Sequence, residues 1–246
     1  MRFKIISSNH SRKLAIKIFL PLILSLCVGL TFLFSTLSVL AAPKKLPKNK
    51  SADPIVIIDA GHGGFDGGAT VGEIYEKDIN LSIANTLSDM LKLSGVTVIN
   101  TRTTDSSTES DPTLTISARK KSDIKNRLAL ANSQDDAIFV SIHLNKFDSP
   151  SAKGAQIFYA PNAKNSDILA EEIRKSIINS LQKENKRPLK KSTKDAYILY
   201  HSQIPAVIVE CGFMSNQTDL KNLLDKEYQT KLAFAICTGI LEYLDR

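Results

Sequence analysis

Short runs of β-branched apolar residues alternate along the chain with segments of helical periodicity, and this alternation constrains the fold more than any other feature. A continuous apolar run of four to six residues is typical of a strand buried on both faces. Strands that alternate with helices predict an α/β fold, with a mostly parallel twisted sheet of about six strands flanked by helices on both faces. The runs that we interpret as strands are residues 55–58, 96–99, 137–142, 154–159 and 206–209.

Four further segments carry apolar residues at every third or fourth position, as one face of an α-helix requires. The first should begin near Asp78, a plausible N-cap, and stop at Gly95. The polar stretch that runs to about Thr115 should be a surface loop. The expected apolar stripes are Ile79, Ile83, Leu87 and Leu91; Ile124, Leu128 and Ala131; Leu169, Ile173 and Ile177; and Leu232, Ile236, Ile240 and Tyr243.

The first 42 residues have the pattern of an export segment. A basic start is followed over 18–42 by an apolar run that only small residues, Ser, Thr and Pro21 interrupt. The run is long enough to span a bilayer, and its small residues near Ala42 also resemble a cleavage site. A cleaved signal peptide and an uncleaved membrane anchor therefore both stay open. Residues 43–53 should form a solvated linker, and 54–246 a single domain.

The formal charge of +7 comes from the front of the chain. Nine of the 32 basic residues lie in the first 50 positions, which hold no acidic residue, so the remainder carries 23 basic against 25 acidic groups. A nearly neutral domain argues against a nucleic-acid-binding protein. The globular part holds only Cys211 and Cys237, which is no disulfide framework, so free thiols are expected.

Three residues with chemical potential follow the predicted buried strands directly. His62 follows the first strand within a glycine-rich loop, His143 follows the run 137–142, and Glu210 follows the run 206–209. In open α/β sheets, ligands bind at the carboxyl ends of the strands. We therefore expect these three side chains to converge on one edge of the sheet.

Two histidines and one glutamate are a common ligand set of catalytic zinc, which keeps one position for water. Spacing favours Glu76, at the entry of a helix, as the third ligand, but leaves Glu73 as an alternative. Apolar neighbours of Glu210 should hold its pKa near the working pH, so that it can accept and return a proton during amide hydrolysis. A nucleophilic role of the adjacent Cys211 is the less favoured hypothesis.

Taken together, these segments resemble the zinc-dependent N-acetylmuramoyl-L-alanine amidase family, which cuts the amide between the muramic acid lactyl group and L-alanine in peptidoglycan. The resemblance spans most of the predicted domain and makes 54–246 the catalytic domain. It implies that His62, Glu76 and His143 bind Zn²⁺ and that Glu210 is the catalytic acid/base. The segments that carry it are 57–64, 76–78, 101–102, 127, 131–132, 141–145 and 205–213.

Four further positions match recurring family residues: Asn145, Arg102, Arg127 and Asn132. The resemblance implies that Asn145 contacts the substrate, whereas substrate contact and support of the fold are both open for Arg102, Arg127 and Asn132. The basic residues over 183–194 are interpreted as a solvated loop rather than a binding surface, although peptidoglycan stems are acidic. The expected partners are the glycan strand and its stem peptide.

Within that family the chain looks most like the germination-specific amidases of spore-forming bacteria, which act on spore cortex in muramic-δ-lactam formation. An exported enzyme, secreted or membrane-anchored through residues 1–42, is therefore expected. The alternatives are a vegetative cell-wall amidase, an amidase that needs an activator protein, and a non-catalytic peptidoglycan-binding protein. No residue identifies an activator.

Overall fold

The computed structural model describes residues 55–109 and 111–246, and the predicted export segment and linker lie outside this range. Within it, six strands form one sheet in the order β4-β1-β5-β8-β6-β7. A small hairpin, β2 (Thr70–Val71) and β3 (Ile74–Tyr75), stands apart from this sheet. The sheet strands are β1 (Ile55–Ala60), β4 (Thr97–Asn100), β5 (Ala137–Asn145), β6 (Gln156–Tyr159), β7 (Lys190–Lys191) and β8 (Ala206–Phe213).

The pairing of the strands confirms the predicted mostly parallel sheet. β4, β1, β5 and β8 run parallel to one another, whereas β6 is antiparallel to β8 and parallel to β7. The parallel strands place their carboxyl ends at one edge, and the antiparallel β6 begins at that same edge. Residues 149–155, which precede β6, therefore lie near the ends of the strands that carry the predicted site.

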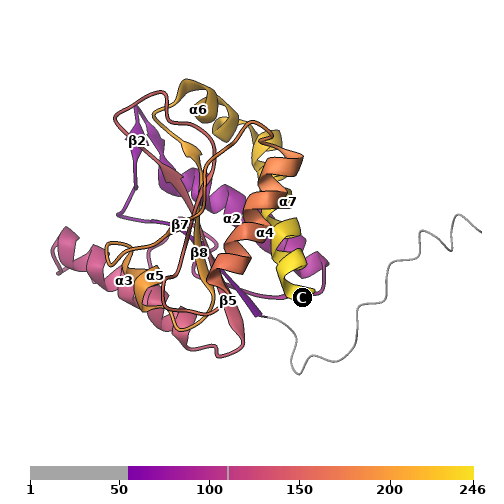
Figure 1. Ribbon diagram of the computed structural model, residues 1–246. Helices are drawn as coiled ribbons and strands as arrows, with labels where there is room; N and C mark the ends of the chain where they lie inside the picture. The colour runs from indigo at the N-terminus through magenta and orange to yellow at the C-terminus, as the bar shows by residue number, and fades with distance from the viewer. Residues whose placement is uncertain (1–54, 110) are drawn as a thin grey trace, which may run out of the picture. The chain divides into compact units, whose positions relative to one another are not determined.

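Helices cover both faces of the sheet, as the alternation of elements predicted (Figure 1). On one side α2 and α7, and α4 and α7, pack against each other over the strands, and α3 and α5 lie together on the other side. α6 packs against α7 and β8. The helices are α2 (Glu76–Leu93), α3 (Ile116–Asn132), α4 (Ser166–Ser180), α5 (Tyr197–His201), α6 (Gln217–Leu224) and α7 (Lys226–Leu244).

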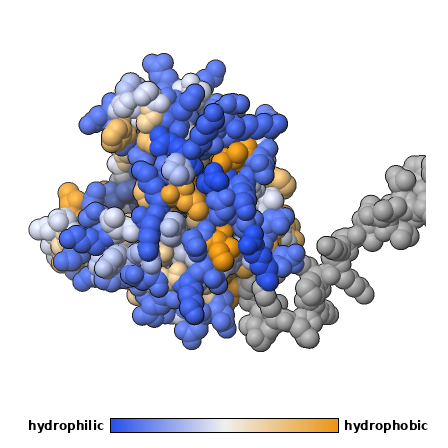
Figure 2. All heavy atoms as spheres, in the orientation of Figure 1, coloured by the Kyte–Doolittle hydropathy of each residue, from blue (hydrophilic) through white to orange (hydrophobic). Residues whose placement is uncertain are grey.

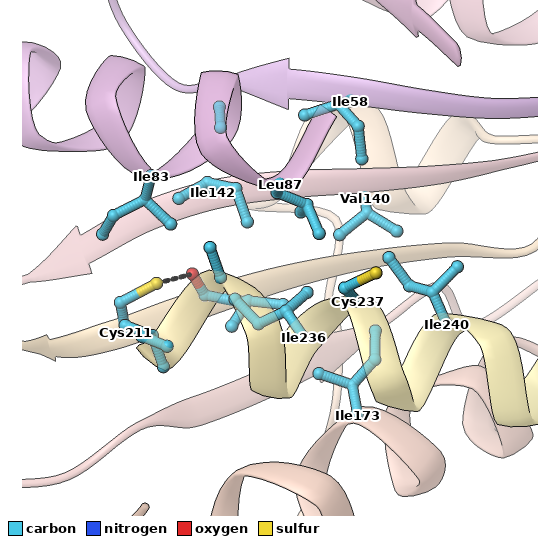
Figure 3. Packing of buried hydrophobic residues seen from close by; sticks show 14 of the residues in the cluster. Ile58, Ile83, Leu87, Val140, Ile142, Ile173, Cys211, Ile236, Cys237 and Ile240 are labelled. Carbon is cyan, nitrogen blue, oxygen red and sulfur yellow. Dashed lines mark hydrogen bonds between the residues drawn. The ribbon is translucent and has the colours of Figure 1, made fainter. Parts of the chain in front are cut away.

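Alternate residues of each strand divide the core into two apolar clusters. Val56 and Ile58 of β1 join the larger cluster beneath α2, α4 and α7, while Ile57 joins a smaller cluster on the α3 and α5 side. Figure 3 shows Ile83 and Leu87 of α2 facing Ile142 and Val140 of β5 in the larger cluster. The surface seen in Figure 2 is mostly hydrophilic, with small separate apolar spots. No helix among the described residues is long and apolar enough to cross a membrane.

Two predicted details of the helices are wrong. α2 begins at Glu76 after Tyr75, not at Asp78, so Glu76 belongs to the first helical turn. In α3 the expected apolar stripe is buried only at Ala131 and is exposed at Ile124, and the rest of the buried face carries Asp123 and Arg127. The periodicity misled because α3 buries charged groups that pair with each other, which a hydrophobic pattern does not register.

Four short elements had no signal in the sequence: the β2–β3 hairpin, β7, α5 and α6. Each has eight residues or fewer, too short for a periodic pattern to identify. Of the charged stretch 183–194, Lys190 and Lys191 pair with β6 and form the edge of the sheet. That stretch is therefore partly structured rather than a solvated loop throughout.

Candidate metal centre

The loop after β1 turns sharply at His62, which has a φ of 61°, a left-handed conformation uncommon outside glycine. Two buried arginines hold the carbonyl groups of this loop. Arg127 donates from Nη1 to Ala60 O (2.8 Å) and from Nη2 to His62 O (2.6 Å). Arg102 donates from Nε to Ala60 O (2.8 Å) and from Nη2 to Gly61 O (3.0 Å). These contacts favour support of the loop over substrate contact for both arginines.

A carboxylate orients the side chain of His62. The Nδ1 atom donates to Asp66 Oδ2 at 2.8 Å, so Nε2 faces Glu76 Oε2 at 3.3 Å. Lys120 of α3 binds the other oxygen of Asp66 at 2.8 Å. Burial by itself lowers the pKa of His62, but Asp66 and Glu76 outweigh it and raise the pKa to about 9. The same negative surroundings that favour a proton favour a metal cation.

Glu76 lies at the centre of the site because α2 begins with it. Its Oε1 lies 3.0 Å from His143 Nδ1 and accepts a hydrogen bond from Leu144 N, also at 3.0 Å. Its Oε2 accepts from Ala69 N at 2.9 Å. Burial raises the pKa of Glu76, but His143 and His62 more than compensate and hold it well below its usual range. Glu76 is therefore a buried anion between two imidazole rings.

The positions of the glycines leave room for this arrangement. The rings of His62 and His143 meet edge to face with centroids 4.9 Å apart. A Cβ atom on Gly61 would lie 2.3 Å from the ring of His143, and one on Gly68 would lie 2.7 Å from Glu76 Oε2 and His62 Cδ2. Glycine is thus required at both positions for the three side chains to gather.

Glu210 stands next to His143 on the neighbouring strand, as the β5–β8 register pairs the two residues. Its Oε2 atom is buried and has no hydrogen-bond partner among the described residues. Burial raises its pKa, and the charge of Glu76 adds to this effect, whereas His143 and His62 oppose it; the result is about 7. An unpartnered buried carboxyl oxygen with this pKa is suited to exchanging a proton near neutral pH.

The site lies on a face of the sheet rather than only beyond its edge. β5 continues to Asn145 and β8 to Phe213, so both strands are longer than the apolar runs predicted and include His143 and Glu210. Ile142 and Leu144 point into the larger apolar cluster, so the intervening His143 points to the α3 side. The apolar run 137–142 therefore ends where the smaller apolar cluster ends and the site begins, but β5 itself continues to Asn145.

The structure gathers three of the predicted residues as a possible metal site. One ligand atom from each of His62, Glu76 and His143 lies within 4.8 Å of the other two. Asn145 ends β5 two residues beyond His143, and its backbone oxygen accepts from Met214 N. Asn132 is not brought there: its side chain bridges His201 O and Gln203 N, before the start of β8.

Cys211 points away from the site. Its Sγ donates to Val209 O, as Figure 3 shows, and lies within the larger apolar cluster. Burial raises the pKa of its thiol far above the usual range, and Glu210 adds to the effect. A neutral, buried thiol is a poor nucleophile. Both cysteines of the described residues are free, as expected.

The fold and this site define a class of α/β proteins in which two histidines and a glutamate can hold one metal ion beside a separate carboxyl group. The chain belongs to the N-acetylmuramoyl-L-alanine amidase family, whose sequence profile matches residues 56–242. It is therefore an amidase that acts on peptidoglycan.

Individual relatives agree with this assignment. The chain is 35% identical over 193 residues to the germination-specific N-acetylmuramoyl-L-alanine amidase of Bacillus subtilis, covering 77% of this chain and 79% of that protein. The CwlD amidase from Clostridioides difficile, solved in complex with the GerS lipoprotein, is 39% identical with a TM-score of 0.74, covering 77% and 98%. The amidase AmiC2 of Nostoc punctiforme is 32% identical with a TM-score of 0.67, covering 80% and 100%.

Asp59, which pairs with Arg127 beneath the loop, should make stability depend on acid pH. Burial by itself raises the pKa of Asp59, but Arg127 and Ser141 lower it from 3.8 to about 2. The stabilisation is therefore fully present above about pH 5 and is lost as the pH falls through 2. A shift of this size corresponds to about 2 kcal/mol of unfolding free energy.

Urea unfolding of wild type and Asp59→Asn between pH 7 and pH 2 measures this contribution. The difference between the free energies of unfolding of wild type and Asp59→Asn should shrink by about 2 kcal/mol as the pH falls from about 4 to 2. The exposed Asp89→Asn serves as the control and should follow wild type throughout. A gap that is constant with pH would contradict the assigned pKa.

Proposed function

We propose that the enzyme is a zinc amidase in which His62, Glu76 and His143 hold Zn²⁺ and Glu210 exchanges protons with the substrate. The bond cut is the amide between the lactyl group of N-acetylmuramic acid and L-alanine of the stem peptide. The observation that carries this proposal is the unpartnered Oε2 of Glu210, on the strand position that pairs with His143. A structural carboxylate in that position would be expected to have an ion-pair partner.

The donor set suits zinc. Two imidazoles and one carboxylate are a common set for catalytic zinc and leave one coordination position open. The hydrogen bond from His62 to Asp66 has the form of an outer carboxylate that fixes a ligand ring. When bound, zinc would acidify water and polarise the carbonyl group of the amide.

The carboxyl group of Glu210 would provide the proton transfers. With a pKa of about 7, its carboxylate form can accept a proton from the attacking water. The protonated form can then donate to the leaving nitrogen as the carbon–nitrogen bond breaks. The products are the lactyl carboxylic acid and a stem peptide with a free L-alanine amine. The hydroxyl group of the water goes to the acyl carbon, and its other hydrogen goes to the amine nitrogen.

The proposal also includes the domain organisation of the chain and its export. We assign residues 1–42 to an export signal or membrane anchor, 43–53 to a linker and 54–246 to the catalytic domain. A peptidoglycan substrate requires action outside the cytoplasm, and the relatives include proteins named as cell wall amidases. Whether residues 1–42 are cleaved would follow from the N-terminal sequence of the mature protein.

The first prediction for this site concerns metal content. Replacing Glu76 by Gln removes the anionic ligand, so zinc affinity should fall by more than the roughly 10- to 100-fold that the loss of an outer partner of a metal ligand costs. The matched control is Glu73→Gln, the alternative ligand in the sequence, which is exposed and should retain zinc. Metal analysis of the purified full chains measures both.

The same measurement tests dependence on a partner. The Clostridioides difficile relative was solved with a lipoprotein bound, and a similar exported partner is our second proposal for this chain. Full zinc occupancy and activity of wild type by itself would contradict that dependence. Loss of zinc from Glu73→Gln but not from Glu76→Gln would reverse the assignment of the ligands.

A second prediction separates proton transfer from metal binding. Glu210→Gln keeps the shape of the side chain but cannot accept the proton, so kcat on purified muropeptide should fall by about 10²- to 10⁴-fold with zinc content unchanged. Glu242→Gln, on the exposed side of α7, is the control. Cleavage by Glu210→Gln at the wild-type rate would refute the mechanism. No cleavage by zinc-loaded wild type would favour a peptidoglycan-binding protein.

We further propose that the substrate in the cell is spore cortex, where this cleavage is the first step of muramic-δ-lactam formation. Support comes from the similarity to a germination-specific amidase at 35% identity. Spores of a strain that lacks the gene should contain no muramic-δ-lactam in their cortex and should fail to complete germination. Normal lactam content together with unseparated vegetative cells would favour the alternative, a vegetative wall amidase.

A further inference from the structure

A basic cavity opens one strand away from the candidate metal centre. Its volume is about 730 Å³, and segments 151–154 and 180–188 line it together with parts of α6 and α7. None of His62, Glu76, His143 and Glu210 lines it. Its charged lining consists of Lys153, Lys183, Lys186 and Arg187 against Glu184 and Asp219.

Arg187 is the most constrained cation of this cavity. Its Nε donates to Lys153 O at 2.8 Å and its Nη1 to Gln156 Oε1 at 3.0 Å, while the guanidinium lies 4.4 Å over the ring of Phe213. In residues 55–109 and 111–246 no carboxylate pairs with it and Nη2 makes no hydrogen bond. A half-buried guanidinium whose Nη2 atom has no acceptor can bind an anion without further rearrangement.

The surrounding loop is built to hold Arg187 in place. Asn185 Oδ1 accepts from the backbone nitrogen of Arg187, and its Nδ2 donates to Ala155 O at 2.9 Å. Gln182 accepts from Ala155 N and donates to Tyr228 OH. The contact between the two segments is close, since a Cβ on Gly154 would lie 3.1 Å from the side chain of Asn185. These bonds make the segment 182–187 an ordered wall rather than a solvated loop.

Of the two acidic residues that line the cavity, Glu184 forms no ion pair among the described residues, and Asp219 is already engaged in hydrogen bonds. Asp219 Oδ2 accepts from Gly154 N at 2.7 Å and from Phe213 N at 2.9 Å. It links β8 to the segment that precedes β6 and forms no ion pair with Arg187 among the described residues. The positive charge of the cavity therefore remains available to a ligand.

Gln156 links Arg187 to the site. It is paired directly with Glu210 in the β6–β8 ladder, so both side chains lie on the same face of the sheet with Cβ atoms about 5 Å apart. The guanidinium of Arg187 touches the end of the Gln156 side chain and hence lies on the order of 10 Å from the Glu210 carboxyl. An extended peptide covers this distance in about three residues.

We propose that this cavity binds the stem peptide of the substrate through a carboxylate that Arg187 holds. The inference rests on the proposed function, since a stem peptide is a ligand here only if its amide lies at Glu210. The volume suits a few peptide residues. A carboxylate can form two parallel hydrogen bonds with the planar guanidinium of arginine. The three neighbouring lysines attract the same negative charge but do not fix its orientation.

Binding and cleavage together test the proposal. The probes are two N-acetylmuramoyl tripeptides that begin with L-alanine and differ only at the third residue, whose carboxyl group is free in one and amidated in the other; every other carboxyl group of the peptide is amidated in both. Dissociation constants are measured on full-length Glu210→Gln, with and without Arg187→Gln. The carboxylate ligand should bind on the order of 10- to 100-fold tighter, and Arg187→Gln should remove this preference.

The controls separate charge recognition from folding. Arg187→Lys keeps the charge without the fork and should restore part of the preference, whereas Arg174→Gln, which breaks only the pair with Glu171 on α4, should leave it unchanged. Equal binding of both ligands, or equal weakening of both by Arg187→Gln, would overturn the proposal. Failure of zinc-loaded wild type to cleave either probe refutes the proposed function instead, and the binding preference still decides the role of Arg187.

Discussion

The buried ion pair between Asp59 and Arg127 connects the sheet and α3 to the loop that carries His62. Asp59 belongs to β1 and Arg127 to α3, and their Oδ1 and Nη1 atoms lie 2.6 Å apart with both side chains almost fully buried. The same guanidinium holds His62 O and pairs with Asp123. Because a buried charge without a partner is costly, the helix, the strand and the loop must assemble together. The left-handed turn at His62 depends on this assembly.

A second constraint is the difference between the two faces of the sheet. Beneath α2, α4 and α7 the strands are apolar to their ends, so this face serves packing. On the other face the apolar cluster is smaller, and His143 and Glu210 follow it on neighbouring strands. Within the described part of the chain, burial among these strands leaves a carboxyl oxygen of Glu210 without a hydrogen-bond partner. The same burial gives the group a pKa suited to proton exchange.

Much of the fold could be predicted because long apolar runs and stripes report burial directly. The runs at 55–58 and 206–209 and the stripe Leu169, Ile173 and Ile177 correspond to β1, β8 and α4. Prediction failed where burial is polar or the element is short. Arg127 and Asp123 are buried through ion pairs, and β7 has two residues, so neither leaves a hydrophobic pattern. The basic stretch before β7 likewise gave no sign that Asn185 and Gln182 hold it in one conformation.

The sequence by itself determined which elements form, and it marked His62, His143 and Glu210 by placing each after an apolar run. It also determined the family, because the motifs occur in a specific order. Only the tertiary structure decided that these residues share one face, that α2 starts at Glu76, and that Arg187 lies one strand from Glu210. The reason is physical: periodicity encodes the burial of a residue relative to its own element, whereas strand order, register and polar contacts arise between elements distant in the chain.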